Sequence, residues 1–160
     1  MHPTLRYGLL LGLGVAAWGF VFNLLGWHKQ PALYFLRFIL VVVAYQVALL
    51  IWALRGTAQE GGYGRQVWTG VSISLLASVI VYASSILFVT VIFPTHIQES
   101  VAASRQLMAA QGVSPEQIEA VIKTQAPLQT PRASAMAGVF GTVMTGLFTS
   151  LIAAVWFRKK

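Results

Sequence analysis

Four long apolar segments determine the environment in which this chain of 160 residues can fold. They cover residues 7–27, 33–54, 67–93 and 133–157, and Arg37 is the only charged residue inside any of them. Each segment has the approximately 20 residues that a helix needs to cross about 30 Å of hydrocarbon. We therefore predict an all-α, polytopic membrane protein with four transmembrane helices, forming a single membrane domain over residues 1–160.

The composition and the placement of charge agree with a membrane protein and exclude other classes. Only 9% of the residues are charged, against about a quarter in soluble domains. The net charge of +7 does not indicate a nucleic-acid partner, because the basic residues flank the spans instead of forming one cluster. The predicted partner is the lipid bilayer, and the chain is too short for an additional soluble catalytic domain.

The distribution of Lys and Arg predicts the orientation. Six of the eleven lie on the side of the termini, opposed only by Glu60: Arg6, Arg55, Arg65, Arg158, Lys159 and Lys160. Basic residues accumulate in cytoplasmic loops. We expect a multi-pass protein of the bacterial inner membrane with both termini in the cytoplasm. A cleaved signal peptide is the alternative for the first span, but its apolar stretch is longer than a signal core.

Residues 95–126 form the one long polar segment, and their pattern is helical. Apolar residues recur at helical spacing from Thr95 to Gln111, where Gly112 is suited to end a helix. Ser114 followed by Pro115 then predicts a new helix that runs to about Lys123. We predict an extracytoplasmic amphipathic helical hairpin between the third and fourth spans. It would lie on the membrane or cap the bundle, or else dock a partner.

Small residues recur at every fourth position of the last span. We call this set the small-residue seam: Ser134, Gly138, Thr142, Gly146, Ser150 and Ala154. The first span repeats the spacing with Gly8, Gly12 and Ala16. Such stripes allow the backbones of two helices to approach closely. The sequence leaves two interpretations open, which are packing within the bundle and formation of a homodimer.

The spans contain few groups that could perform chemistry. The chain has no Asp and no Cys, and no predicted span contains Glu, His or Lys. A serine nucleophile would need a neighbouring base. We therefore expect no catalytic residues, no cofactor and no enzymatic activity.

Three polar residues nevertheless fall inside the spans. Arg37 is near a span end, where its side chain can reach the interface or contact a lipid phosphate. Gln46 and Asn23 lie deeper, where a side-chain amide bridges helices or lines a path for a small solute. On the outer side, His28, His96 and Glu99 are candidate metal ligands or ordinary interfacial polar residues.

Several short stretches, in order and spacing, resemble the uncharacterised bacterial membrane-protein family DUF4199, a domain of unknown function. They are Arg6-Tyr7-Gly8-Leu9, Ser74-Leu75-Leu76-Ala77-Ser78, Gly112-Val113-Ser114 and Ser150-Leu151-Ile152-Ala153-Ala154. The loop 56–65 departs from the family pattern, since Gly61-Gly62-Tyr63-Gly64 replaces an acidic, phenylalanine-bearing approach to the third span. The resemblance implies four spans with a polar insert before the last.

Two functional hypotheses follow from these observations. The first is a small, non-catalytic inner-membrane protein that self-associates as a homodimer or serves as an accessory to another membrane protein. The second is an oligomeric protein for the transport or permeation of a small solute or ion. In that case Gln46, Asn23 and the serines of the third span would surround a cavity.

Overall fold

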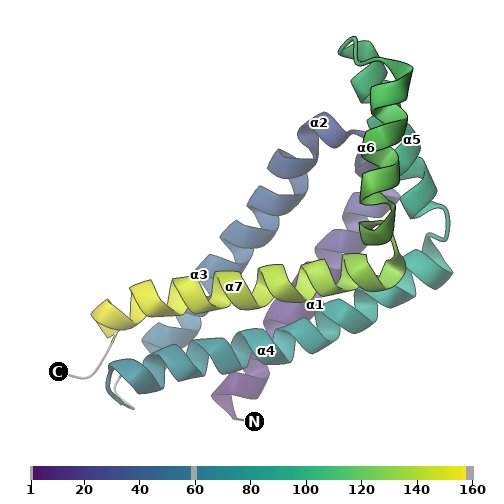
Figure 1. Ribbon diagram of the computed structural model, residues 1–160. Helices are drawn as coiled ribbons and strands as arrows, with labels where there is room; N and C mark the ends of the chain where they lie inside the picture. Colours follow the sequence, from purple (N-terminus) through teal and green to yellow (C-terminus); the bar gives the residue numbers. More distant parts are fainter. Residues whose placement is uncertain (1, 59–60, 158–160) are drawn as a thin grey trace.

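The computed structural model describes residues 2–58 and 61–157 as helices packed on helices (Figure 1). Within these ranges, four spans are long and apolar enough to cross a bilayer. The first span is α1 (Pro3–Leu24), and the last is α7 (Pro131–Phe157). The second span combines α2 (Pro31–Tyr34), a π-helical segment (Phe35–Leu40) and α3 (Val41–Gly56). The third combines α4 (Tyr63–Leu87) and a second π-helical segment (Phe88–Ile92). The predicted fold class is confirmed.

The first span differs from the predicted range 7–27 at both ends. Helix α1 begins at Pro3, because proline lacks the N–H that the first turn of a helix leaves unpaired. It ends at Leu24, because Gly26 has a φ of 68° and leaves the helical conformation. Trp27 therefore belongs to a short 3₁₀ segment, η1 (Trp27–Lys29), and not to the span.

The two ends of the bundle are distinct. Both described chain ends and the α3–α4 connection lie at one end, and the polar insert lies at the other (Figure 1). We refer to these as the terminal side and the hairpin side. The charge argument for orientation also used Glu60 and residues 158–160, which are outside the described residues.

The insert is a hairpin of two helices, α5 (His96–Ala110) and α6 (Pro115–Gln125). Between them, Gly112 has a φ of 81°, and the Ser114 hydroxyl accepts a hydrogen bond from the Gln117 backbone N–H at 3.4 Å. Ile118 and Ile122 of α6 are buried, and α6 packs against α5. The apolar stripe of α6 is thus used inside the hairpin.

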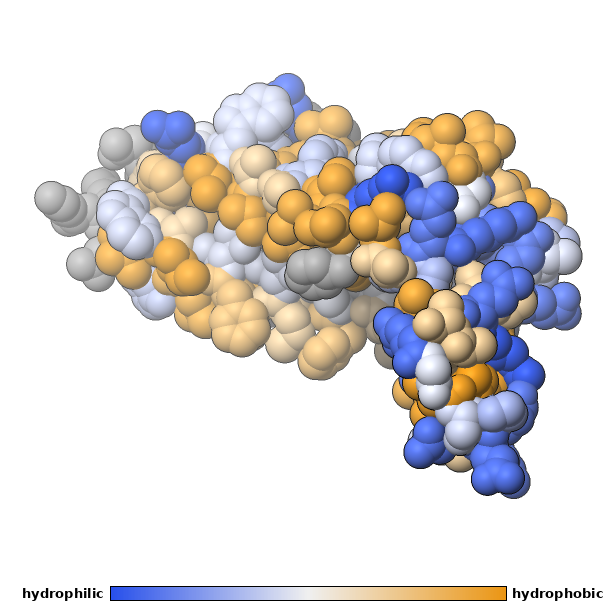
Figure 2. Space-filling model, turned by 90° about the horizontal axis from the view of Figure 1, so that it is seen from above, coloured by the Kyte–Doolittle hydropathy of each residue, from blue (hydrophilic) through white to orange (hydrophobic). Residues whose placement is uncertain are grey.

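The hairpin separates from the apolar part of the molecule. Figure 2 shows hydrophilic residues gathered on the projecting hairpin, while hydrophobic residues cover the face formed by the spans. Large apolar side chains such as Trp68, Val79 and Phe140 are about two-thirds exposed on the outside of the bundle. This surface is suited to lipid and not to water.

Helices α4 and α7 make the closest contact in the bundle, through small residues. A Cβ built on Gly146 would lie 2.5 Å from the Ser74 Cβ, and one built on Gly70 would lie 2.9 Å from the Ser150 Cβ. The two serine hydroxyls are satisfied locally, because Ser74 donates to the Gly70 carbonyl and Ser150 donates to the Gly146 carbonyl. The seam residues Gly146 and Ser150 therefore face α4 of the same chain.

The first span uses its small residues in the same way. Built Cβ atoms on Gly8 and Gly12 would each lie 2.8 Å from a Cβ of α4, on Leu76 and Ile80 respectively. Helix α4 is consequently the central helix, held by α1 on one flank and by α7 on another.

An apolar cluster fills the centre of the bundle on the terminal side, and an open apolar groove of about 520 Å³ runs beside it between α3 and α7. Leu11, Leu50, Ile73 and Ala77 are fully buried there, and with Ala53 they belong to one apolar cluster. Near the α3–α4 connection, the Gln66 side chain donates a hydrogen bond of 2.5 Å to the Thr57 carbonyl. The described buried residues of this cluster are all apolar.

We predict that Gly146→Ala lowers the free energy of unfolding by about 1–3 kcal/mol, because the added methyl group overpacks the contact with Ser74. Denaturant titration of the protein in detergent micelles measures this change. Gly141→Ala is the matched control on the same helix, since nothing lies within 4 Å of its built Cβ. It should be neutral or stabilising, because alanine favours the helix over glycine by about 1 kcal/mol. Equal stability of the two variants would contradict the packing described here.

Candidate functional site

A cavity of about 440 Å³ lies between the spans in the hairpin-side half of the bundle. All four spans contribute to its wall, and His96 at the start of α5 reaches it from the hairpin. The volume is in the range of about 300–1,000 Å³ that is typical of small-molecule sites.

Small residues create the cavity in this half of the molecule. A Cβ built on Gly19 would meet only the Phe88 Cε2 atom, at 3.7 Å, and one built on Gly141 would meet nothing within 4 Å. Gly138 and Ala16 also line the cavity. The glycines that bring helices together on the terminal side are thus followed, on the hairpin side, by glycines that leave a space.

Both π-helical segments border this space. Phe38 and Ile39 belong to the first segment, Phe88 and Val89 belong to the second, and all four line the cavity. A π-helical turn inside a helix is rare and is found frequently at functional sites. The coincidence of both segments with one cavity supports a functional role for it.

Two predicted intramembrane polar residues, Gln46 and Asn23, line the cavity. The Gln46 side-chain amide donates a hydrogen bond of 2.5 Å to the Thr142 carbonyl of α7, and the residue is 1% exposed. The Asn23 side-chain amide donates to the Gly19 carbonyl at 2.8 Å, and the Asn23 Oδ1 is buried without a partner among the described residues. Each amide therefore uses its NH₂ group on backbone.

Hydroxyl groups from α4 and α7 complete the polar part of the wall. Ser84 donates to the Val81 carbonyl of its own helix at 3.1 Å. Ser85, Thr142 and Thr145 also line the cavity, and within residues 2–58 and 61–157 their hydroxyls make no hydrogen bond. Gln46, Asn23 and two serines of the third span, Ser84 and Ser85, thus line one cavity of a single chain, whereas the sequence-based hypothesis placed such a cavity in an oligomer.

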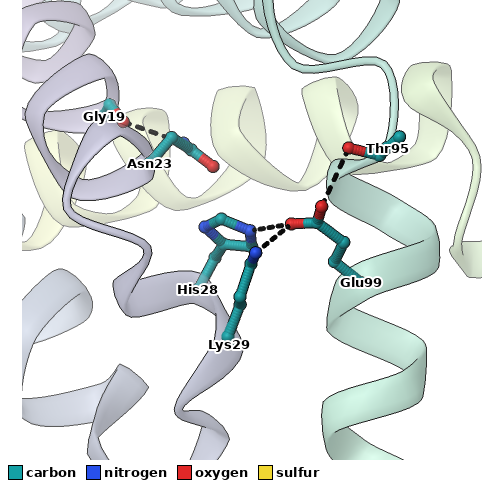
Figure 3. A network of polar contacts seen from close by, with 6 residues as sticks. All are labelled: Gly19, Asn23, His28, Lys29, Thr95 and Glu99. Atoms are coloured by element: carbon teal, nitrogen blue, oxygen red, sulfur yellow. Dashed lines mark hydrogen bonds and ion pairs between the residues drawn. The ribbon is translucent and has the colours of Figure 1, made fainter.

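A polar cluster at the hairpin side joins α5 to the bundle (Figure 3). Glu99 accepts hydrogen bonds from the His28 ring at 2.8 Å and from Thr95 at 3.0 Å, and its carboxylate lies 3.1 Å from the Lys29 ammonium. The rings of His28 and His96 lie beside each other, tilted by 44°, with centroids 4.8 Å apart. The cluster is the polar attachment between the hairpin and η1.

The cluster changes the titration of two of its groups. Hydrogen bonds from His28, Lys29 and Thr95 lower the pKa of Glu99 to about 2, so that its carboxylate is ionised at neutral pH. Burial, and to a lesser degree the charge of His28, lower the pKa of His96 below its ordinary value of 6.5. His96 is therefore neutral at the mouth of the cavity.

The structure brings together the three residues named as candidate metal ligands, His28, His96 and Glu99. Within the described ranges, no group of three or more His, Cys, Asp or Glu residues is arranged to hold a metal ion. Glu99 is instead engaged by Lys29 and Thr95. The geometry thus matches a set of interfacial polar contacts.

Arg37 does not line the cavity, whereas Ser134 of the seam does. The Arg37 guanidinium donates to the Gln30 side-chain oxygen at 2.6 Å and lies 4.9 Å above the Trp27 ring, at the hairpin-side surface. Ser134, at the start of the seam, lines the cavity but is exposed.

Sequence reasoning missed Gly19 and Gly141. The available signal was spacing: Gly19 lies three residues after Ala16, and Gly141 lies three residues after Gly138. Each of these two glycines makes the stripe of small residues on its helix wider than one helix–helix contact requires.

The fold and the cavity define a class, which is a four-span α-helical membrane protein with a largely apolar cavity that contains a few polar groups. The chain matches the model of the family described as "Protein of unknown function (DUF4199)" over residues 6–159, and it belongs to that family. Comparison with curated proteins and with solved structures gave no match.

We predict that docking of α5 weakens in acid. The pKa of His96 is lowered in the docked hairpin, so protonation of His96 below pH 6.5 favours the undocked state and weakens docking. Glu99 loses its contribution to docking only between pH 4.5 and about 2. His28 and Lys29 of η1 and Glu99 of α5 are the charged or titratable groups beside His96. Amide hydrogen exchange in α5, corrected for the intrinsic rate, should be faster at pH 5 than at pH 7.

His96→Phe should remove most of this difference, because Glu99 stays ionised over the same interval. The same exchange protection at pH 7 and pH 5 in the unmodified protein would contradict the assignment.

Proposed function

We propose that this protein is a non-catalytic, multi-pass membrane protein that binds one amphipathic small molecule in the hairpin-side cavity. The observation that carries the proposal is the cavity of about 440 Å³, whose wall holds both intramembrane amides and several free hydroxyls. Polar groups in a membrane interior are costly and usually serve a function. Apolar walls with a few converging polar groups are typical of ligand sites.

The residues around the cavity favour binding over catalysis. Among the described residues that line it, the acid–base groups are His96 and Tyr34, and none is Asp, Glu, Lys or Arg. Covalent or acid–base catalysis needs a nucleophile with a base in hydrogen-bond reach. Ser84, a nearby hydroxyl, instead donates to its own helix.

The closed terminal side favours binding over permeation. Beyond Val15 and Gln46, the fully buried side chains of Leu11, Leu50 and Ala77 fill the interior. A solute that entered from the hairpin side would stop at this cluster. Transport would require the cluster to open, whereas binding requires no change there.

The same geometry limits how partners would attach. Thr142, Gly146 and Ser150 are buried, and Gly146 meets α4 of the same chain, so a homodimer would use another surface. One side of α6, which includes Glu116 and Lys123, is exposed. We propose that a membrane partner, where the protein acts as an accessory, contacts that side.

We further propose that the protein resides in the bacterial inner membrane with its termini in the cytoplasm. The chain has no cysteine, so single introduced cysteines report their own position. A membrane-impermeant thiol reagent applied to spheroplasts should label Glu116→Cys and should leave Gly62→Cys unlabelled until the membrane is opened. Both sites are exposed in the structure, and the reverse labelling pattern would contradict this orientation.

Filling the cavity should abolish binding. Gly19→Leu places a side chain into the open space beside Phe88, and we expect at least a fivefold decrease in photolabelling by a diazirine-bearing oleyl alcohol. Labelled peptides, identified by mass spectrometry, should include Phe38 or Phe88 in the unmodified protein. Ala83→Leu on the exposed face of α4 is the matched control and should label normally. Unchanged labelling of Gly19→Leu would overturn the proposed function.

A further inference from the structure

The hydrogen-bonding state of the cavity specifies the head group of its ligand, and this inference rests on the proposed function. Both intramembrane amides are oriented in the same way. Asn23 donates its NH₂ to the Gly19 carbonyl and Gln46 donates its NH₂ to the Thr142 carbonyl. The two side-chain oxygens remain, and an oxygen of this kind can only accept.

The orientation of Asn23 follows from its surroundings. If the amide were turned over, its oxygen would face the Gly19 carbonyl oxygen, and two acceptors would oppose each other. Figure 3 shows the Asn23 oxygen directed away from Gly19 and toward the side of His28. This oxygen is buried without a partner among the described residues. An unsatisfied buried acceptor is costly, so a ligand that donates to it gains affinity.

Gln46 supplies a second amide oxygen at the inner end of the cavity. It is 1% exposed, it lines the cavity, and within the described residues its oxygen receives no hydrogen bond. Asn23 lies near the end of α1 and Gln46 lies inside α3. The two amide oxygens therefore favour a ligand with a hydrogen-bond donor, in either orientation of the ligand in the cavity.

The charges around the cavity exclude an ammonium as that donor. No described residue in the wall is Asp, Glu, Lys or Arg. At the mouth, Glu99 is already paired with Lys29, at 3.1 Å. A charged head group in this space would be buried without a counter-ion, which costs several kcal/mol for each ion. A carboxylate or phosphate would be buried there without a counter-ion in the same way, because no described residue of the wall is Lys or Arg.

A hydroxyl group meets both conditions, because it donates and carries no charge. It also accepts, which suits the hydroxyls of Ser85 and Thr145 on the opposite wall. The hydrocarbon chain of such a ligand would lie against the aromatic side chains of Phe22, Phe38 and Phe88. We infer that the cavity binds an uncharged lipid with a hydroxyl-bearing head group, which donates hydrogen bonds to the free oxygens of Asn23 and Gln46.

The test compares four competitors that share one C18 chain: 1-monooleoylglycerol, methyl oleate, oleylamine and oleate. Each competes with the photoreactive oleyl alcohol for the full-length protein in neutral nanodiscs. The glycerol ester should be at least about tenfold more potent than the other three, as expected for one or two net hydrogen bonds. Methyl oleate, oleylamine or oleate competing as well as the glycerol ester would overturn the inference.

Two variants locate the preference. Asn23→Leu and Gln46→Met each remove a free oxygen, and at least one should reduce the tenfold preference to within about threefold. Ser84→Ala is the matched control, because that hydroxyl lines the cavity but is already bonded to Val81. A preference that persists in both variants would also overturn the inference. Gln46→Met removes a helix contact, and if it fails to fold, Asn23→Leu and the competitor series still decide.

The two levels of the proposal fail differently. If Gly19→Leu blocks labelling and methyl oleate competes as well as the glycerol ester, the cavity binds ligands but the head-group assignment is wrong. If Gly19→Leu labels normally and none of the four compounds competes, the proposed function itself is wrong.

Discussion

The structure depends on the contact between α4 and α7, in which a glycine of each helix packs against a serine of the other. Gly146 faces Ser74 and Gly70 faces Ser150, and each hydroxyl is bonded to the backbone of its own helix. Lipid provides no hydrophobic force that would press these helices together, so close van der Waals packing must do it. The absence of side-chain bulk allows that approach, and the local hydrogen bonds keep the serines from being unsatisfied in hydrocarbon.

This contact also explains why a cavity exists at the other end. Once α4 and α7 are held together on the terminal side, the apolar cluster around Leu11, Leu50 and Ile73 fills the remaining interior there. On the hairpin side, Gly19 and Gly141 supply no bulk and the combined α2–α3 span diverges from α7 (Figure 1). The two π-helical segments fall on this open half. Glycine thus allows close packing of α4 and α7 in one half of the bundle and leaves a cavity in the other.

The sequence predicted the features that depend on local pattern. Four spans follow from uninterrupted apolar runs, and the hairpin follows from Gly112, Ser114 and Pro115, whose conformations are dictated within a few residues. The end of α1 was misplaced because Trp27 and Gly26 look apolar, while the φ of 68° at Gly26 ends the helix. Gln46 and Asn23 were recognised as unusual, but their convergence depends on how α1, α3 and α7 pack. Periodicity along one helix contains no information on that arrangement.

Disulfide formation between Val81→Cys and Gly138→Cys tests the central α4–α7 contact most directly. A Cβ built on Gly138 lies 3.1 Å from a Val81 methyl carbon, which is compatible with the approximately 3.5–4.5 Å between the Cβ atoms of a disulfide. The chain contains no other cysteine that could interfere. Oxidation in native membranes should give a disulfide within one chain, seen as a monomer whose cross-linked peptides map to α4 and α7. A product dominated by dimers linked between two chains, with no cross-link inside either, would contradict this account.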